Sequence, residues 1–132
     1  KLQQNLFICA SSVAQWAGVA ALSKDGLAAA EAMRRTYDTR RKALLAGLTR
    51  LGLAPRTEPT GAFYVFVRAD HLHPNSLALA YDILEKAHVG VTPGIDFGPG
   101  GEGHLRFSYA NSLENIEEGL ARLERYIADH CR

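Results

Sequence analysis

The stretch from Val91 to Ala110, V-T-P-G-I-D-F-G-P-G-G-E-G-H-L-R-F-S-Y-A, constrains the fold of this chain more than any other part. It begins at the end of a strand, breaks at Pro93-Gly94 and continues through a loop rich in glycine. Gly-rich segments of this kind let the backbone approach another part of the structure closely. The stretch then ends in a segment, 104–110, with the alternation of a β-strand.

Apolar and polar residues alternate along 104–110, as they do in a strand with one buried face. One face carries Leu105, Phe107 and Tyr109, and the other carries His104, Arg106 and Ser108. Arg106 is therefore expected in the middle of a strand, on its polar face. A guanidinium held by a strand fits a carboxylate through two parallel hydrogen bonds. The alternative is that Arg106 is an edge-strand charge that pairs with a nearby Asp or Glu.

Length and charge limit the classes of protein to consider. A chain of 132 residues, 47% hydrophobic and 22% charged, has the composition of a globular domain with a real core. Fifteen basic and fourteen acidic residues give a net charge of +1, which provides no electrostatic footprint for nucleic acid or an anionic membrane. No apolar run is long enough to span a bilayer, and no secretory signal pattern opens the chain. We therefore expect a cytoplasmic protein without nucleic-acid or membrane partners.

Metal chemistry is not expected from this sequence. Cys9 and Cys131 lie near opposite ends, outside any Cys/His cluster, and are expected to be reduced thiols. His71 and His73 could supply two metal ligands, but no third ligand is evident, and a solvated loop is the better interpretation.

Helical and strand periodicities predict a two-layer domain. The expected order is helix, helix, strand, strand, helix, strand, strand, helix. Helices are expected within 1–22, where Ser11 and Ser12 are placed as caps, over 26–51 and 75–87, and from 111–112 onward. Strands are expected at 62–68, 89–91 and 104–110. We expect one α/β domain of α+β type over residues 1–132, a small, mostly antiparallel sheet flanked by helices on one main side.

Two segments leave questions open. The strand 62–68 is apolar on both faces, which is typical of a strand covered on both faces, and some of that cover could come from outside this chain. The helix 26–51 has a basic cluster in its middle, and a solvated helix face is favoured over an anion site. This cluster consists of Arg34, Arg35, Arg40, Arg41 and Lys42.

No catalytic residue is expected within the chain. The glycines of 98–103 are not followed by the Lys-Ser/Thr of a phosphate-binding loop. Lys24, Lys42 and Lys86 have the pattern of helix-surface residues, whereas a Schiff-base lysine needs desolvation or a cationic neighbour. Lys1 lies at the terminus.

Three stretches resemble the C-terminal small domain of class I/II, fold type I, pyridoxal-phosphate aminotransferases. They are A-Q-W-A-G-V-A-A-L at 14–22, P-T-G-A-F-Y-V-F at 59–66, and the stretch 91–110, which is similar to the family's P-G-x-x-F-G…G-x-x-R-x-S-x-A signature. The last is the most specific of the three. The resemblance extends over almost the whole chain and identifies Arg106 with the arginine that binds the α-carboxylate of the substrate.

The resemblance implies a protein that moves an amino group between an amino acid and a 2-oxo acid. It also implies that the lysine and most other groups that bind pyridoxal 5'-phosphate lie in an upstream large domain, so this chain alone is not expected to hold the cofactor or to be active. A homodimer is implied, with residues 1–25 as connection and hinge. Asn5, Ser11 and Ser12 are candidates for contacts with the other subunit or the pocket, although the serines could equally be helix caps.

Other functions remain open at this point. A C–S lyase or a protein similar to aminocyclopropane-carboxylate synthase would share the carboxylate arginine. A regulator with an aminotransferase-like domain, or a stand-alone ligand-binding module, would share only the architecture. Asp96 and His104 flank the stretch that carries Arg106 and are either substrate contacts or surface residues.

Overall fold

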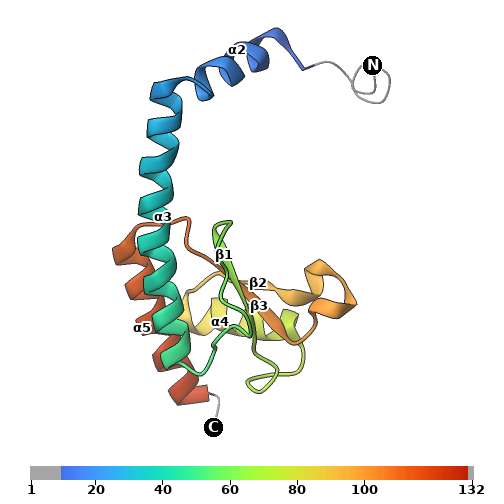
Figure 1. The fold of residues 1–132 in the computed structure, drawn as a ribbon. Coiled ribbons are helices and arrows are strands. Elements are labelled where there is room, and N and C mark those ends of the chain that lie inside the picture. The colour runs from blue at the N-terminus through green and yellow to red at the C-terminus, as the bar shows by residue number, and fades with distance from the viewer. Residues whose placement is uncertain (1–9, 131–132) are drawn as a thin grey trace. The chain divides into compact units, whose positions relative to one another are not determined.

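The structure, a computed structural model, describes residues 10–130, and the chain falls into two compact units, 1–36 and 37–132. None of the helices it describes is long and apolar enough to cross a membrane. The elements, labelled in Figure 1, are α2 (Ser12–Ala21), α3 (Lys24–Arg50), β1 (Tyr64–Arg68), α4 (Ser76–Ala87), β2 (Thr92–Pro93), the 3-10 turns η1 (Gly94–Phe97) and η2 (Pro99–Gly101), β3 (His104–Ser108) and α5 (Leu113–His130).

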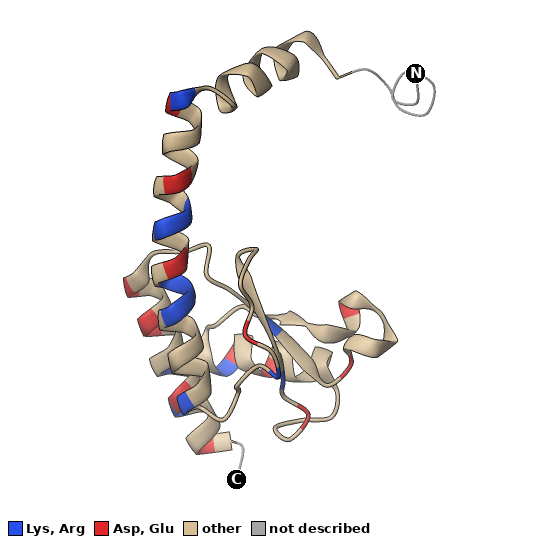
Figure 2. Cartoon of the chain, in the orientation of Figure 1, with Lys and Arg blue, Asp and Glu red and all other residues tan. Residues whose placement is uncertain are grey.

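The first unit contains α2 and the first half of α3. The Ser11 side chain caps α2, as expected, because its Oγ accepts a hydrogen bond from the N–H of Ala14 at 3.3 Å. Ser23 acts in the same way at the start of α3, where its Oγ accepts from the N–H of Gly26 at 3.1 Å. No residue of α2 is buried, and the helix is tan throughout in Figure 2 because it carries no charge.

The second unit contains a three-stranded antiparallel sheet in the order β1-β3-β2, so that β3 is the central strand. On β3, Arg106 lies directly opposite Phe66 of β1 on one side and Thr92 of β2 on the other. Residues opposite each other in an antiparallel sheet point to the same face. The expectation of a small antiparallel sheet with helices beside it is confirmed.

The core lies on one face of this sheet. Val65 and Val67 of β1 and Leu105 and Phe107 of β3 are buried there. The helices α4, α5 and the part of α3 that belongs to this unit supply the other half of the core (Figure 1), through Leu44, Leu48, Leu79, Ile83, Ile116, Leu120 and Leu123. The alternation predicted for 104–108 is confirmed, because the apolar residues enter this core.

The opposite face of the sheet is open. Tyr64 of β1 is 37% exposed and Phe66 is half-buried. The described part of the chain therefore covers β1 on one face only, although its sequence is apolar on both. The same open face carries Arg106.

Two of the strand predictions were wrong. The structure has a single strand between α3 and α4, because after β1 the chain turns at Ala69, whose carbonyl accepts the N–H of Leu72 at 2.9 Å. The short strand expected at 89–91 lies instead at Thr92–Pro93. The reason is that His88 ends α4 in the left-handed conformation (φ 56°), so the chain reaches a position opposite β3 only after Val91.

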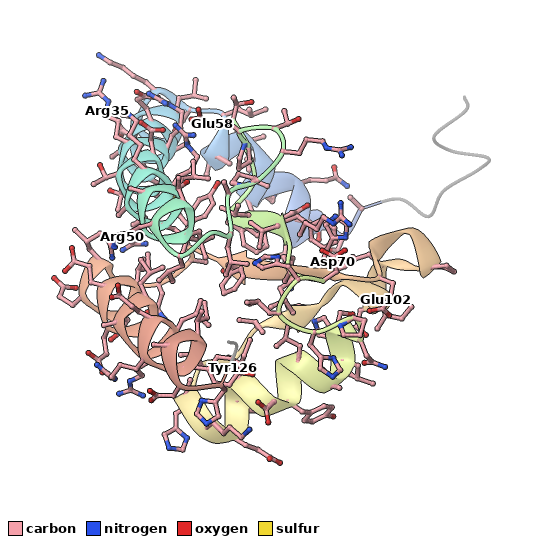
Figure 3. All side chains as sticks on the ribbon, turned by 90° about the horizontal axis from the view of Figure 1, so that it is seen from below. Arg35, Arg50, Glu58, Asp70, Glu102 and Tyr126 are labelled. Carbon is pink, nitrogen blue, oxygen red and sulfur yellow. The ribbon has the colours of Figure 1, made fainter. Side chains whose placement is uncertain are left out.

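The glycine-rich loop between β2 and β3 is closed on itself and tied to α4. Gly94 and Gly101 pack so closely that a Cβ on either would meet the carbonyl oxygen of the other. The carboxylate of Glu102, labelled in Figure 3 near the start of α4, accepts hydrogen bonds from the N–H groups of Ser76 (2.6 Å) and Gly103 (3.0 Å). In return, Ser76 Oγ accepts from the N–H of Ile95 at 3.2 Å. The loop thus has a fixed shape.

We expect Gly94→Ala to destabilise the protein by about 1–3 kcal/mol, because the new methyl group would force the two turns of the loop apart. Gly100→Ala is the matched control in the same loop, since a Cβ there meets nothing within 4 Å. Its effect should stay within about 0.5 kcal/mol. Urea unfolding of the three proteins measures both values, and equal effects at the two positions would contradict the packing described here.

Glu102 should make stability depend on acidity. The N–H groups of Ser76 and Gly103 lower the pKa of the Glu102 carboxyl below its ordinary value of 4.5. A group whose pKa is lower in the folded state stabilises the fold above its unfolded pKa, and that contribution is lost as the pH falls through the folded pKa. Glu102→Gln should therefore be less stable than the wild type at pH 7, and the difference should shrink below pH 4.5. Denaturant unfolding across this pH range measures it, and a difference that does not change with pH would be the contrary result.

Candidate carboxylate-binding site

Arg106 is oriented by the sheet but is not neutralised by it. Its Nη2 donates a hydrogen bond to Thr92 Oγ1 at 3.1 Å, across the β2–β3 ladder. Its Nε is buried and has no hydrogen-bond partner within residues 10–130. No carboxylate in this range forms an ion pair with Arg106, whereas Arg41, Arg68 and Arg122 each have an acidic partner. The guanidinium thus keeps donor capacity that an anion could use.

Aromatic rings surround this guanidinium. Its Cζ lies 5.4 Å from the ring centre of Tyr64 and 5.1 Å from that of Phe97, both within the range of cation–π attraction. Phe66 packs edge-on against Phe97 with ring centres 5.7 Å apart. We call Tyr64, Phe66 and Phe97 the aromatic frame. It reduces the access of water to Arg106, which strengthens any charge-assisted hydrogen bond formed there.

The alternative role for Arg106, an edge-strand charge paired with an acid, does not fit this geometry. β3 is the central strand of the sheet, and the residues opposite Arg106 are Phe66 and Thr92. A cation on a half-covered apolar face, without an acidic partner in the described range, is costly unless it binds an anion. The arrangement is therefore suited to a planar carboxylate.

The other candidates from the sequence have different surroundings. Asn5 lies outside the described residues. Ser11 and Ser12 are exposed at the start of α2 in the first unit, where Ser11 is the cap. Asp96 is exposed in η1, while His104 stacks on Phe66 with ring centres 4.9 Å apart. His104 thus adjoins the aromatic frame.

Histidines elsewhere in the described range form no metal site. His73 Nδ1 lies within hydrogen-bond distance of the backbone N–H and C=O of Asn75, both at 3.1 Å, so the ring helps to shape the turn before α4. Residues 10–130 contain no group of three or more His, Cys, Asp or Glu side chains placed to hold a metal ion.

Sequence reasoning did not single out Thr92 or the aromatic frame as parts of the site. The antiparallel register could have placed Tyr64 and Phe66 on the same face as Arg106, because both belong to the apolar strand whose second face was left without cover. Phe97 carried no such signal, since its position depends on the shape of a 3-10 turn.

Comparisons with known proteins give a consistent family. The family described as "Aminotransferase class I and II" matches residues 1–123. A (5-formylfuran-3-yl)methyl phosphate transaminase of Methanocaldococcus jannaschii is 39% identical over 96% of this chain and 33% of its own length. An aspartate aminotransferase of Pyrococcus abyssi is 37% identical over 98% of this chain and 33% of its own length. The chain thus spans about a third of the length of these relatives.

Solved structures give the same result. An aminotransferase from Mycobacterium tuberculosis is similar with a TM-score of 0.87 and 35% identity, over 97% of this chain and 33% of that one. Aspartate aminotransferase from Thermus thermophilus with maleate is similar with a TM-score of 0.79 and 40% identity, over 93% of this chain and 31% of that one. The fold, the strand that carries Arg106 and these similarities lead to one conclusion: the chain belongs to the class I and II aminotransferases.

Proposed function

We propose that this chain is the part of an aminotransferase that binds the α-carboxylate of an amino acid and of a 2-oxo acid, with Arg106 as the binding residue. The observation that carries the proposal is the state of its guanidinium. It is fixed by Thr92, surrounded by the aromatic frame, and not neutralised by any acidic side chain of the described residues. A charged, oriented and partly dehydrated fork binds a planar carboxylate tightly.

Aminotransferases of this class use pyridoxal phosphate, which supplies the electron sink for the reaction when it is bound. The described residues do not fit this group. Lys24 is exposed, Lys42 Nζ pairs with Asp38 Oδ2 at 2.7 Å, and Lys86 Nζ pairs with Asp82 Oδ1 at 2.8 Å. No lysine of residues 10–130 is therefore desolvated and free to form a Schiff base. We infer that the cofactor is held by another part of the complete enzyme, the large domain that the length of the relatives implies.

The surface of α2 supports the presence of such a part. This helix has no charged residue and no buried residue, and Trp16 is 75% exposed. An uncharged helix in which alanine, valine and tryptophan predominate is normally covered by other parts of a protein. We propose that the large domain covers α2, that the segment 1–25 connects the two domains as a hinge, and that the enzyme is a cytoplasmic homodimer in which Asn5, Ser11 or Ser12 lies at a subunit contact.

The role of Arg106 can be tested in the complete enzyme with Arg106→Gln. Removing the charged partner of a carboxylate in a closed site costs about 2–5 kcal/mol, so KM for the amino acid should rise by a factor of about thirty or more. Arg122→Gln is the control, because Arg122 pairs with Glu118 on the surface of α5. Steady-state transamination assays measure both variants. An unchanged KM, or release of ammonia and a thiol instead of transfer of the amino group to the second 2-oxo acid, would contradict the proposal.

The cover of α2 can be tested with Trp16→Ser in the complete enzyme. A buried tryptophan that is truncated costs about 3–5 kcal/mol of stability, whereas an exposed side chain costs within about 0.5 kcal/mol. We expect the large value, and Trp16→Phe, which retains an aromatic ring, should lose much less. Denaturant unfolding measures the two variants, and a negligible loss for Trp16→Ser would mean that α2 is not covered.

A further inference from the structure

The loop from Glu58 to Phe63, which leads into β1, has a conformation that its own sequence does not favour. The φ angle of Ala62 is 62°, in the left-handed region, whereas the φ angle of the adjacent Gly61 is not positive. A residue with a Cβ is rarely found there, and such a conformation persists only where the surrounding structure imposes it. Neighbouring groups must therefore hold this loop from outside.

Arg41 of α3 holds the beginning of the loop. Its Nη1 donates to Glu58 Oε1 at 2.6 Å and to the carbonyl oxygen of Pro59 at 3.0 Å. Its Nε and Nη2 donate to Asp38 Oδ1 at 3.1 and 2.8 Å, which fixes the guanidinium on the helix. The side chain is only 12% exposed. Lys42 and then Arg41 lower the pKa of Asp38 to about 2, so its carboxylate stays charged at any physiological pH.

Tyr109 holds the end of the loop. Its hydroxyl lies 3.1 Å from the carbonyl oxygens of both Gly61 and Ala62 and donates its proton to them, on the two sides of the strained residue. Its backbone N–H donates to the carbonyl of Phe63 at 2.8 Å. The ring is buried against Tyr37 of α3, and this burial raises the pKa of Tyr109, so the phenol remains a donor.

These contacts fix the backbone from which the side chains of Phe63 and Tyr64 project at the start of β1. Phe63 is 47% exposed and packs edge-on against Tyr64 with ring centres 5.4 Å apart. Tyr64 in turn lies 5.4 Å from Arg106 Cζ. Because these rings bury little surface, core packing alone does not account for a strained loop held by this set of hydrogen bonds. The result of the arrangement is a fixed position for one side of the aromatic frame.

We propose that Arg41 is a positioning residue for carboxylate binding: through Glu58 and Pro59 it holds the 58–63 loop so that Tyr64 keeps the Arg106 guanidinium in its binding orientation. This inference rests on the proposed function of Arg106. Figure 3 labels Glu58, the loop residue whose carboxylate Arg41 binds. Substrate itself need not touch Arg41.

The test compares Arg41→Gln with Lys42→Gln in the complete enzyme. Lys42 is the matched control, because it pairs with the same Asp38 on the same helix, whereas Glu58 of the loop pairs with Arg41. Arg41→Gln should raise KM for the amino acid by about tenfold, since a small displacement of a binding group is costly, and should leave kcat nearly unchanged. Lys42→Gln should change neither. Arg41→Lys should give an intermediate KM, because lysine keeps the charge but not the fork.

A second measurement separates this inference from the proposed function. Amide hydrogen exchange of residues 60–65 should be faster in Arg41→Gln than in the wild type and in Lys42→Gln. Glu58→Gln, a milder change at an exposed carboxylate, should show the same trend if Arg41→Gln does not fold. Faster exchange with an unchanged KM, or unchanged exchange, would overturn the positioning role while leaving the role of Arg106 intact. Failure of the wild-type enzyme to transaminate any amino acid would instead overturn the proposed function, and the positioning role with it.

Discussion

The antiparallel register of β3 is the constraint on which the rest of this structure depends. Because β3 is the central strand, its two neighbours place Phe66 and Thr92 on either side of Arg106, on the same face. A shift of one residue would move Arg106 into the core and expose Leu105 or Phe107. The buried face prevents such a shift, since Val65, Val67 and Leu105 are completely enclosed. The packing of the core thus determines where the charged side chain lies.

Two connections then determine what lies around the arginine. The glycine-rich loop, tied to α4 through Glu102 and Ser76, brings Phe97 to one side. The 58–63 loop brings Tyr64 to another. Both loops are held by charge-assisted hydrogen bonds rather than by buried apolar area. This is consistent with the carboxylate site that we propose, because apolar cover from the chain itself would block that site.

The sequence predicted the elements and the face of Arg106 more successfully than it predicted the surroundings of Arg106. Period-two alternation over 104–108 and the helical periodicity of 75–87 are local signals, and both were confirmed. The strand at 89–91 was misplaced because the left-handed cap at His88 delays the entry into the sheet.

Arg41 looked like one member of a solvated basic cluster. Only contacts with Glu58 and Pro59, 17 and 18 residues further along the chain, distinguish it from Arg34 and Arg35, which face Glu31. Interactions over such separations depend on the tertiary fold and leave no pattern in a single sequence.

The one-sided cover of the sheet also explains how recognition and chemistry are divided in the enzyme that we propose. A carboxylate bound at Arg106 would leave its α-carbon directed away from the core, because the core face is filled by the helices. Lys42 and Lys86, the lysines described in the same unit, pair with Asp38 and Asp82 instead of remaining free to act on that carbon. The group that acts must therefore approach from the open face, which is the face where β1 is apolar but uncovered. A chain that fixes the substrate at one end and leaves the reacting end exposed is suited to close over a second domain, since closure would complete the site and exclude water at once.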